Sequence, residues 1–238
     1  MKQKILLFTM VLLGYAMSGS AQNVTAKAYY TDKEGKDQES TSVEEQAPLT
    51  VTFRANPTGM GENNVSYEWH FQLTKATEQH AAGELFVRYE EDTQYTFNES
   101  GTYNIELRTY VSNTTGGDWL DPQTITVTIA ESKLEFPNAF SPNGDGINDV
   151  YRAKKDYKSI VSFRAIILNR WGQKLYEWDD PAGGWDGTYK GNDVKQGVYF
   201  VFVQAKGADG KDYKIRKDVN LLRGYTDEKN TGGGGNEQ

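Results

Sequence analysis

Hydrophobic and polar side chains alternate with a period of two along much of the first half of the chain. The runs lie at residues 49–54, 65–73, 103–109 and 125–129. This period is typical of β-strands that bury one face and expose the other. The segments between them are rich in Gly, Asn and Pro, as expected for turns. The pattern predicts a β-sandwich over residues 22–132.

The second half shows the same alternation with more glycine between the runs. Residues 160–169 predict a strand that turns back at 170–173 and returns at 174–178. Residues 198–203 are apolar on both faces and predict a central strand, and residues 211–222 predict the last strand. Together they predict a second β-sandwich over residues 133–223. One face of its first strand should be buried. The side chains expected on that face are Val161, Phe163, Ala165 and Ile167.

The two ends of the chain carry no such alternation. Residues 1–21 have an early pair of lysines, a short apolar run and small residues before Gln22, which predicts a cleaved signal peptide and export. No later apolar run is long enough to span a membrane. Residues 224–238 are polar and Gly-rich, and predict a flexible tail.

Charge is distributed unevenly between the two predicted domains. Residues 22–132 hold 7 Lys and Arg against 18 Asp and Glu, a net charge of −11, whereas residues 133–223 hold 16 against 12, a net of +4. This asymmetry supports two domains. The positive charge of the second domain has two interpretations. It is either an ordinary solvated surface, or it lets the domain dock on an acidic partner such as lipopolysaccharide or a protein. A nucleic-acid partner is not expected, because no basic aromatic stripe is present.

The residue types for common catalytic centres are scarce. The chain has no Cys and only two histidines, His70 and His80, which we expect at the surface without catalytic or metal-binding roles. Trp185 and Asp186 lie in a Gly-rich loop that cannot hold a rigid carboxylate pair, as a glycosidase requires. We therefore expect Trp185 to fill the core and Asp186 to cap a turn, and we expect no enzyme.

Residues 136–151, with the sequence FPNAFSPNGDGINDVY, combine proline, glycine, Asn and Asp. One hypothesis is a weak calcium site, because oxygen ligands at alternate positions of a loop suit that ion. Its ligands would be Asn143, Asp145, the Ile147 carbonyl and Asp149. The favoured alternative is an Asx-rich turn whose side chains accept hydrogen bonds from backbone amides. No other cofactor is expected.

Two segments of the first half resemble the PKD-type immunoglobulin-like domains of extracellular proteins, and this resemblance implies an immunoglobulin-like β-sandwich in an all-β chain. Residues 67–71, YEWHF, are similar to the Y-x-W-x-F strand of that family. Residues 95–105 resemble its turn into G-x-Y-x-V. The chain lacks the Gly-Asp-Gly that usually follows the tryptophan strand, so other variants of the immunoglobulin-like fold remain open.

Four segments of the second half resemble the gliding-motility-associated C-terminal domain, the type B sorting domain of the type IX secretion system in Bacteroidota. The matching residues are Asn138, Phe140, Pro142, Asn143, Gly144, Asp145, Gly146, Asn148, Asp149, Asn169, Arg170, Trp171, Gly172, Trp185, Asp186, Gly187, Gly197 and Tyr199. The resemblance implies an immunoglobulin-like sandwich. It also implies that this domain directs its protein to the outer-membrane translocon, for release or for display at the cell surface.

These observations favour a non-enzymatic, secreted or envelope protein. Its C-terminal domain would act in sorting or docking, with an outer-membrane protein or a translocon component as partner, and its N-terminal domain would be an adhesion or spacer module. One alternative is a resident structural subunit docked to an outer-membrane protein complex. A second alternative is a carbohydrate-binding module that stacks a surface glycan on exposed Trp119 or Trp178.

Overall fold

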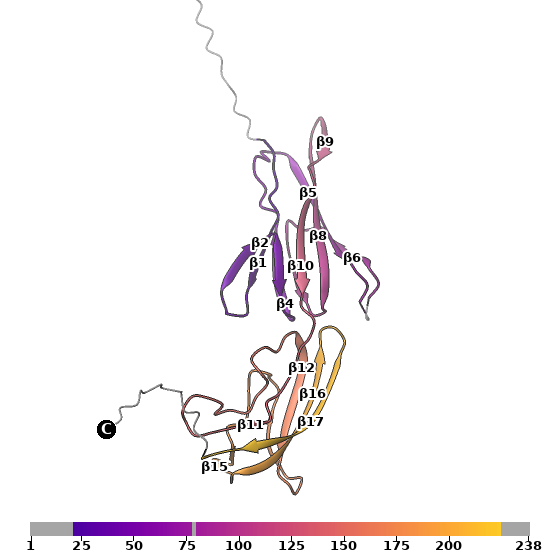
Figure 1. Ribbon diagram of the computed structural model, residues 1–238. Helices are drawn as coiled ribbons and strands as arrows, with labels where there is room; N and C mark the ends of the chain where they lie inside the picture. The colour runs from indigo at the N-terminus through magenta and orange to yellow at the C-terminus, as the bar shows by residue number, and fades with distance from the viewer. Residues whose placement is uncertain (1–20, 78–79, 225–238) are drawn as a thin grey trace, which may run out of the picture.

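The structure is a computed structural model that describes residues 21–77 and 80–224. The predicted signal peptide and tail fall almost wholly outside the described residues. The predicted all-β fold is confirmed: every regular element in the described ranges is a strand, and two β-units follow one another along the chain (Figure 1). No helix able to cross a membrane occurs in the part of the chain that the structure describes.

The first unit packs two sheets face to face. The smaller sheet has the order β2-β1-β4-β7, formed by Asp37–Ser40, Lys27–Thr31, Leu49–Arg54 and Asp92–Phe97. The larger has the order β3-β10-β8-β5-β6, formed by Ser42–Glu45, Gln123–Ile129, Gly101–Asn113, Asn64–Leu73 and Gly83–Arg88, with β9 (Gly116–Trp119) paired to β8. The four predicted strands are confirmed as β4, β5, β8 and β10. Their inward side chains, including Phe53, Trp69 and Phe71, form the first hydrophobic core.

The second unit is built on one five-stranded sheet. Its order is β11-β17-β16-β12-β13, formed by Ala139–Phe140, Asp212–Leu221, Gly197–Gly207, Ile160–Leu168 and Lys174–Trp178. A short ribbon pairs β14 (Thr188–Tyr189) with β15 (Asn192–Asp193). The central position of β16 agrees with the prediction. Loop side chains such as Phe136, Tyr151 and Trp185 contribute to the core in place of a complete second sheet.

The prediction for Val161 is wrong. Its side chain is exposed, whereas Phe163, Ala165 and Ile167 are buried. The register between β12 and β16 shifts between Ile160 and Ser162, which marks a β-bulge. A bulge adds one residue to a strand and breaks the alternation of faces at that point.

The two units meet at the turn between β16 and β17. Ala208 from this turn packs into the core of the first unit. The Ser100 amide donates to the Ala208 carbonyl at 3.0 Å, and the Ala208 amide donates to the Ser159 carbonyl at 2.9 Å. The buried Ser159 hydroxyl donates to the Ala130 carbonyl at 2.6 Å and accepts the Ala47 amide at 3.2 Å. Buried polar groups of both units therefore satisfy one another across the contact.

A second set of hydrogen bonds closes the same contact. The Asp209 carboxylate accepts the Ser132 amide at 3.1 Å, the Ser132 hydroxyl at 2.7 Å and the Lys211 amide at 3.2 Å. The Ser132 hydroxyl also lies 2.9 Å from the Tyr213 hydroxyl. Residues 130–133 form the linker between the two units. We use the term joint for the region in which Ser159, Ala208 and Asp209 contact the first unit and this linker. The predicted domain boundary at residues 132 and 133 lies within it and stays a prediction.

Candidate functional site

The loop that follows β11, at residues 141–149, is held in shape by hydrogen bonds from its own side chains. The Asp149 carboxylate accepts the backbone amides of Asn143, Gly144 and Gly146 at 3.0, 2.7 and 2.8 Å. Hydrogen bonds from Gly144, Gly146 and Asn143 lower the pKa of Asp149. Gly144 and Gly146 both have positive φ, at 81° and 82°, which glycine adopts without a steric cost. These contacts give the loop one defined shape.

The other predicted calcium ligands also have partners within the loop. The Asn143 side chain accepts the Asp145 amide at 3.1 Å and donates to the Asp145 carboxylate at 2.9 Å. Asp145 accepts the Ile147 amide at 2.7 Å, and the Ile147 carbonyl accepts the Ser141 hydroxyl at 3.5 Å. This is the geometry of consecutive Asx turns. Among the described residues, no group of three or more His, Asp and Glu is placed to hold a metal ion. Calcium binding stays a prediction.

The four segments that resemble the sorting domain are called the signature segments from here on. Trp185 brings three of them together in the core. Its ring lies 5.4 Å from Phe140 and 5.1 Å from Tyr199, measured between centroids, and its side chain is fully buried. The indole NH donates to the Thr188 carbonyl at 2.8 Å. Asp186 accepts the Thr188 amide and hydroxyl at 2.9 and 2.8 Å. The expected roles of Trp185 in the core and Asp186 as a turn cap are confirmed.

A backbone bridge holds Trp185 against the end of the segment 136–151. Tyr151 and Trp185 exchange two backbone hydrogen bonds, at 2.8 and 3.0 Å. The neighbouring Gly184 has no room for a side chain, because a Cβ there would lie 2.5 Å from the Tyr151 carbonyl oxygen. Burial raises the pKa of the Tyr151 hydroxyl, which donates to the Pro137 carbonyl at 3.1 Å. The conformation of the Gly-rich loop is thus fixed by this close approach.

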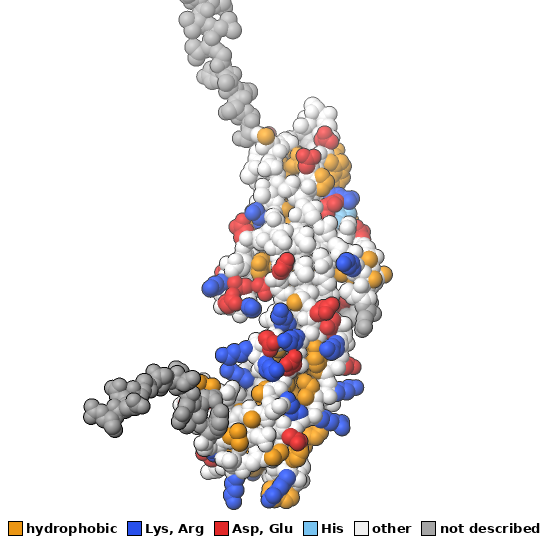
Figure 2. All heavy atoms as spheres, viewed as in Figure 1, with side chains coloured by type: hydrophobic (Ala, Val, Ile, Leu, Met, Phe, Trp, Pro, Cys, Tyr) orange, Lys and Arg blue, Asp and Glu red, His pale blue; other side chains and the backbone are white. Residues whose placement is uncertain are grey.

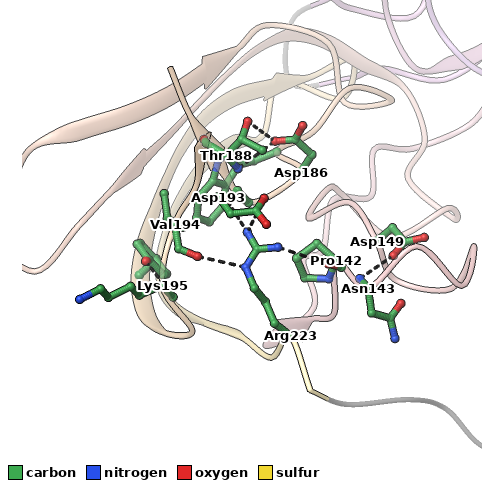
Figure 3. Close-up of polar contacts among 12 residues, drawn as sticks. Pro142, Asn143, Asp149, Asp186, Thr188, Asp193, Val194, Lys195 and Arg223 are labelled. Atoms are coloured by element: carbon green, nitrogen blue, oxygen red, sulfur yellow. Dashed lines mark hydrogen bonds and ion pairs between the residues drawn. The ribbon is translucent and has the colours of Figure 1, made fainter. Parts of the chain in front are cut away.

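Arg223, which the sequence analysis did not single out, fastens the end of the last strand to three loops (Figure 3). Its guanidinium donates to the carbonyls of Val194, Gly187 and Pro142 at 3.0, 2.7 and 3.4 Å. It also pairs with the Asp193 carboxylate at 3.2 Å. A planar guanidinium with several donors suits such convergent carbonyls. Nothing local in the sequence identifies this role, since every partner lies at least 29 residues away in the chain.

The turn between β12 and β13 presents Trp171 to solvent. The Asn169 side chain accepts the amides of Trp171 and Gln173, both at 3.0 Å, and Gly172 has a φ of 78°. Trp171 is 74% exposed, and the Arg170 guanidinium lies 4.3 Å above its ring. We call this pair the Arg170–Trp171 tip. It lies at the end of β12 opposite Ser159, and so faces away from the joint (Figure 1).

The two tryptophans predicted as exposed stacking platforms differ. Trp119 is 51% exposed on β9 and packs on Tyr110, with centroids 5.2 Å apart. The expectation that Trp178 is exposed is wrong: it is 7% exposed and packs in the core against Phe163. Trp178 lies opposite Ala165 in the sheet, and so shares the inward face of that residue.

The prediction of surface histidines holds for one of the two. His80 is exposed, with its ring nitrogen 2.7 Å from Glu99. His70 is only 9% exposed, because Glu84 and Glu68 lie against its two ring nitrogens at 2.7 and 3.3 Å. An outward position on a strand was correctly inferred for His70, but Glu84 of the neighbouring strand β6 and Glu68 of its own strand cover it.

Comparisons with known proteins identify the second unit more specifically than its fold does. Residues 134–217 match the model of the CHU_C family, the type IX secretion signal domain. This range contains all four of the signature segments. No curated protein matches the chain.

Two solved structures match about three quarters of the chain at low identity. Chicken CNTN1 FN1-FN3 domains are 11% identical over 76% of this chain and 64% of that one. The Bacteroides ovatus mixed-linkage glucan utilization locus SGBP-B, solved with a mixed-linkage heptasaccharide, is 14% identical over 76% of this chain and 42% of that one. The chain thus spans less than two thirds of either. Both TM-scores are 0.25, too low to inform on function. The match over residues 134–217 is the informative one: this part of the second unit is similar to the type IX secretion signal domain.

Proposed function

We propose that this chain is a non-enzymatic envelope protein delivered by the type IX route. Its second unit serves as a sorting and docking module, and its first unit serves as an adhesion or spacer module. The observation that carries the proposal is the family match over residues 134–217. The closed loop around Asp149 and the Trp185 core support it, because they give the signature segments one rigid arrangement for recognition.

The Arg170–Trp171 tip is the contact that we assign to the docking partner, an outer-membrane protein or a translocon component. Tryptophan and arginine are enriched among the residues that dominate protein interfaces. Trp171 is largely solvent-exposed, so its side chain adds little to the stability of the unit. Its turn is nevertheless held in shape by Asn169. A partner therefore meets a preorganised aromatic side chain.

The joint favours a second candidate function, in which the chain is a resident subunit that keeps its sorting unit. A protease needs several residues of extended backbone that are free of other contacts, whereas hydrogen bonds hold the backbone of the linker. The Ala130 carbonyl accepts the hydroxyls of Ser159 and Ser100 at 2.6 and 2.7 Å, and the Ser132 amide is held by Asp209. We infer that the two units stay together after delivery, docked to an outer-membrane complex.

A glycan-binding first unit is supported only by Trp119, now that Trp178 is known to be buried. Retardation in polysaccharide affinity gels, lost in Trp119→Ala, would support it. The same gels run with lipopolysaccharide would test the basic second unit as a lipopolysaccharide dock.

Fractionation of the native host tests the sorting role. We expect the chain outside the outer membrane, or on its surface, in cells with an active type IX translocon. In cells whose translocon is disabled, the full chain should accumulate in the periplasm. A chain that reaches the surface equally well in both strains would contradict the proposal.

A further inference from the structure

The second unit carries a basic and apolar surface that its core does not use. Successive side chains of β12, β16 and β17 point to opposite sides of the sheet. Phe163, Ala165, Val201 and Val203 point inward and are buried. The outward positions form what we call the basic face, with members Arg164, Ile166, Phe202, Gln204, Lys214 and Arg216. Cross-strand register places Arg164, Gln204 and Lys214 in one row, and Ile166, Phe202 and Arg216 in the next.

The basic face is hollowed and largely unneutralised. Two adjoining hollows, of about 250 and 340 Å³, share Arg164, Gln204 and Lys214 in their linings. Arg164 pairs with Glu177 at 2.6 Å. Within the described residues, Lys214 and Arg216 form no ion pair, and the Arg216 guanidinium lies over the Phe202 ring at 5.7 Å. Apolar side chains bordered by unpaired cations suit an acidic surface that also presents apolar groups.

The first unit of the same chain presents a surface of that chemistry. Outward side chains of β5, β6, β8 and β9 form what we call the acidic face, with members Glu68, Glu84, Glu106, Tyr110 and Trp119. Arg108 and His70 lie on the same face: Arg108 pairs with Glu106, and His70 contacts Glu68 and Glu84. The exposed fraction of the glutamate side chains falls from 49% for Glu84 to 33% for Glu68 and 22% for Glu106, and Trp119 is 51% exposed. The unit as a whole has a net charge of −11, from 7 basic and 18 acidic residues, against +4 for residues 133–223. The acidic face thus holds three carboxylates against one guanidinium, and this excess of negative charge, with Tyr110 and Trp119 beside it, complements the cations and apolar side chains of the basic face.

The two faces cannot meet within one chain, because the joint places the units end to end (Figure 1). The larger sheet of the first unit and the sheet of the second unit nevertheless lie on the same side of the molecule (Figure 1). Figure 2 shows acidic and hydrophobic side chains along this side of the first unit, with a few Lys, Arg and His side chains among them. Lys and Arg side chains intermingle with hydrophobic ones along the same side of the second unit.

We propose that two copies of this chain pair side by side and antiparallel, with the acidic face of each copy on the basic face of the other. A twofold axis perpendicular to the long axis of the chain makes both contacts at once. Such a contact is self-complementary and closes as a dimer, whereas a single head-to-tail contact would propagate into an open chain. The dimer is independent of the sorting role, since it uses neither the Arg170–Trp171 tip nor the joint.

Sedimentation velocity of residues 22–238 tests this dimer. At 50 mM salt and about 100 µM protein we expect a species of twice the chain mass, which dissociates as salt weakens the charge pairs between the faces. The double variant Lys214→Glu, Arg216→Glu should raise the dimer dissociation constant by roughly tenfold or more. Trp119→Ala should weaken the dimer from the other face.

The matched control carries the same charge change away from the basic face. Arg152 and Lys195 are exposed and line neither hollow. Arg152→Glu, Lys195→Glu should leave the dimer intact, and far-UV circular dichroism should show that all variants fold. A monomeric wild type at 50 mM salt would overturn the proposal, as would equal weakening by the control pair. Species that grow beyond the dimer with concentration would also overturn it, because a closed pair has no free face.

Discussion

Removing the Asp209 carboxylate should open the joint between the two units. In Asp209→Ala the Ser132 amide and hydroxyl lose their acceptor, together with the Lys211 amide. A hydrogen bond to a charged group contributes roughly 1.5–3 kcal/mol when buried, and such contributions are not additive. Because Asp209 is only partly buried, we expect the substitution to lower the free energy of opening the joint by about 2 kcal/mol in total.

Limited proteolysis measures this loss directly at the linker. When cleavage is slow relative to reclosing, its rate follows the population of the open joint. A shift of about 2 kcal/mol corresponds to an increase in cleavage rate of roughly 30-fold between residues 130 and 133. Asp212→Ala is the matched control, since Asp212 is an exposed carboxylate of the neighbouring strand β17. An Asp209→Ala rate within twofold of the wild type would refute the idea that this carboxylate holds the joint.

The same carboxylate predicts a pH dependence. Burial raises the pKa of Asp209, but hydrogen bonds from Ser132 and Lys211 outweigh burial and leave the pKa below its ordinary value. A carboxyl whose pKa is lower in the folded state contributes stability above its unfolded pKa, and this contribution is lost as pH falls through the folded pKa. Cleavage of the wild type by an acid-active protease should therefore rise as pH falls below about 4, with a smaller rise in Asp209→Ala.

Three further substitutions separate the core of the second unit from its exposed tip. Trp185→Ala should cost roughly 3–5 kcal/mol, because it removes a fully buried indole, and an unchanged denaturation midpoint would contradict its place in the core. Gly184→Ala should cost about 1–3 kcal/mol, since its Cβ would meet the Tyr151 carbonyl at 2.5 Å; wild-type stability would show that the loop can move aside. Trp171→Ala should change stability by less than about 0.5 kcal/mol yet reduce delivery to the cell surface, and normal surface display would exclude it as the docking contact.

The strands were predictable because alternation is a local property of the chain. Runs such as residues 65–73 specify which side chains point inward without knowledge of the partners. The prediction failed where pairing intervened. The bulge beside Val161 moved its side chain to the surface, and the register of β13 turned Trp178 toward the core. Glutamates that are near His70 in space covered a position that alternation had correctly placed on the outer face.

The contacts that organise the candidate site were less accessible to sequence reasoning. Motif residues such as Trp185 and Asp149 could be assigned because their roles depend on nearby glycines and amides. The joint and Arg223 depend on residues that are far apart in the chain. Ser159 meets Ala47 across 112 positions, and Asp209 meets Ser132 across 77. Neither pairing leaves a periodic or local pattern, so only the folded structure reveals it.

The most direct test of the central claim is the intact mass of the native protein, taken separately from outer-membrane and medium fractions. A type IX signal domain fixed to its neighbour by the joint predicts one outer-membrane species that contains both units, with residues 133–223 still attached. A surface or medium form that ends near residue 132 would contradict this account. It would show that the second unit is removed after delivery.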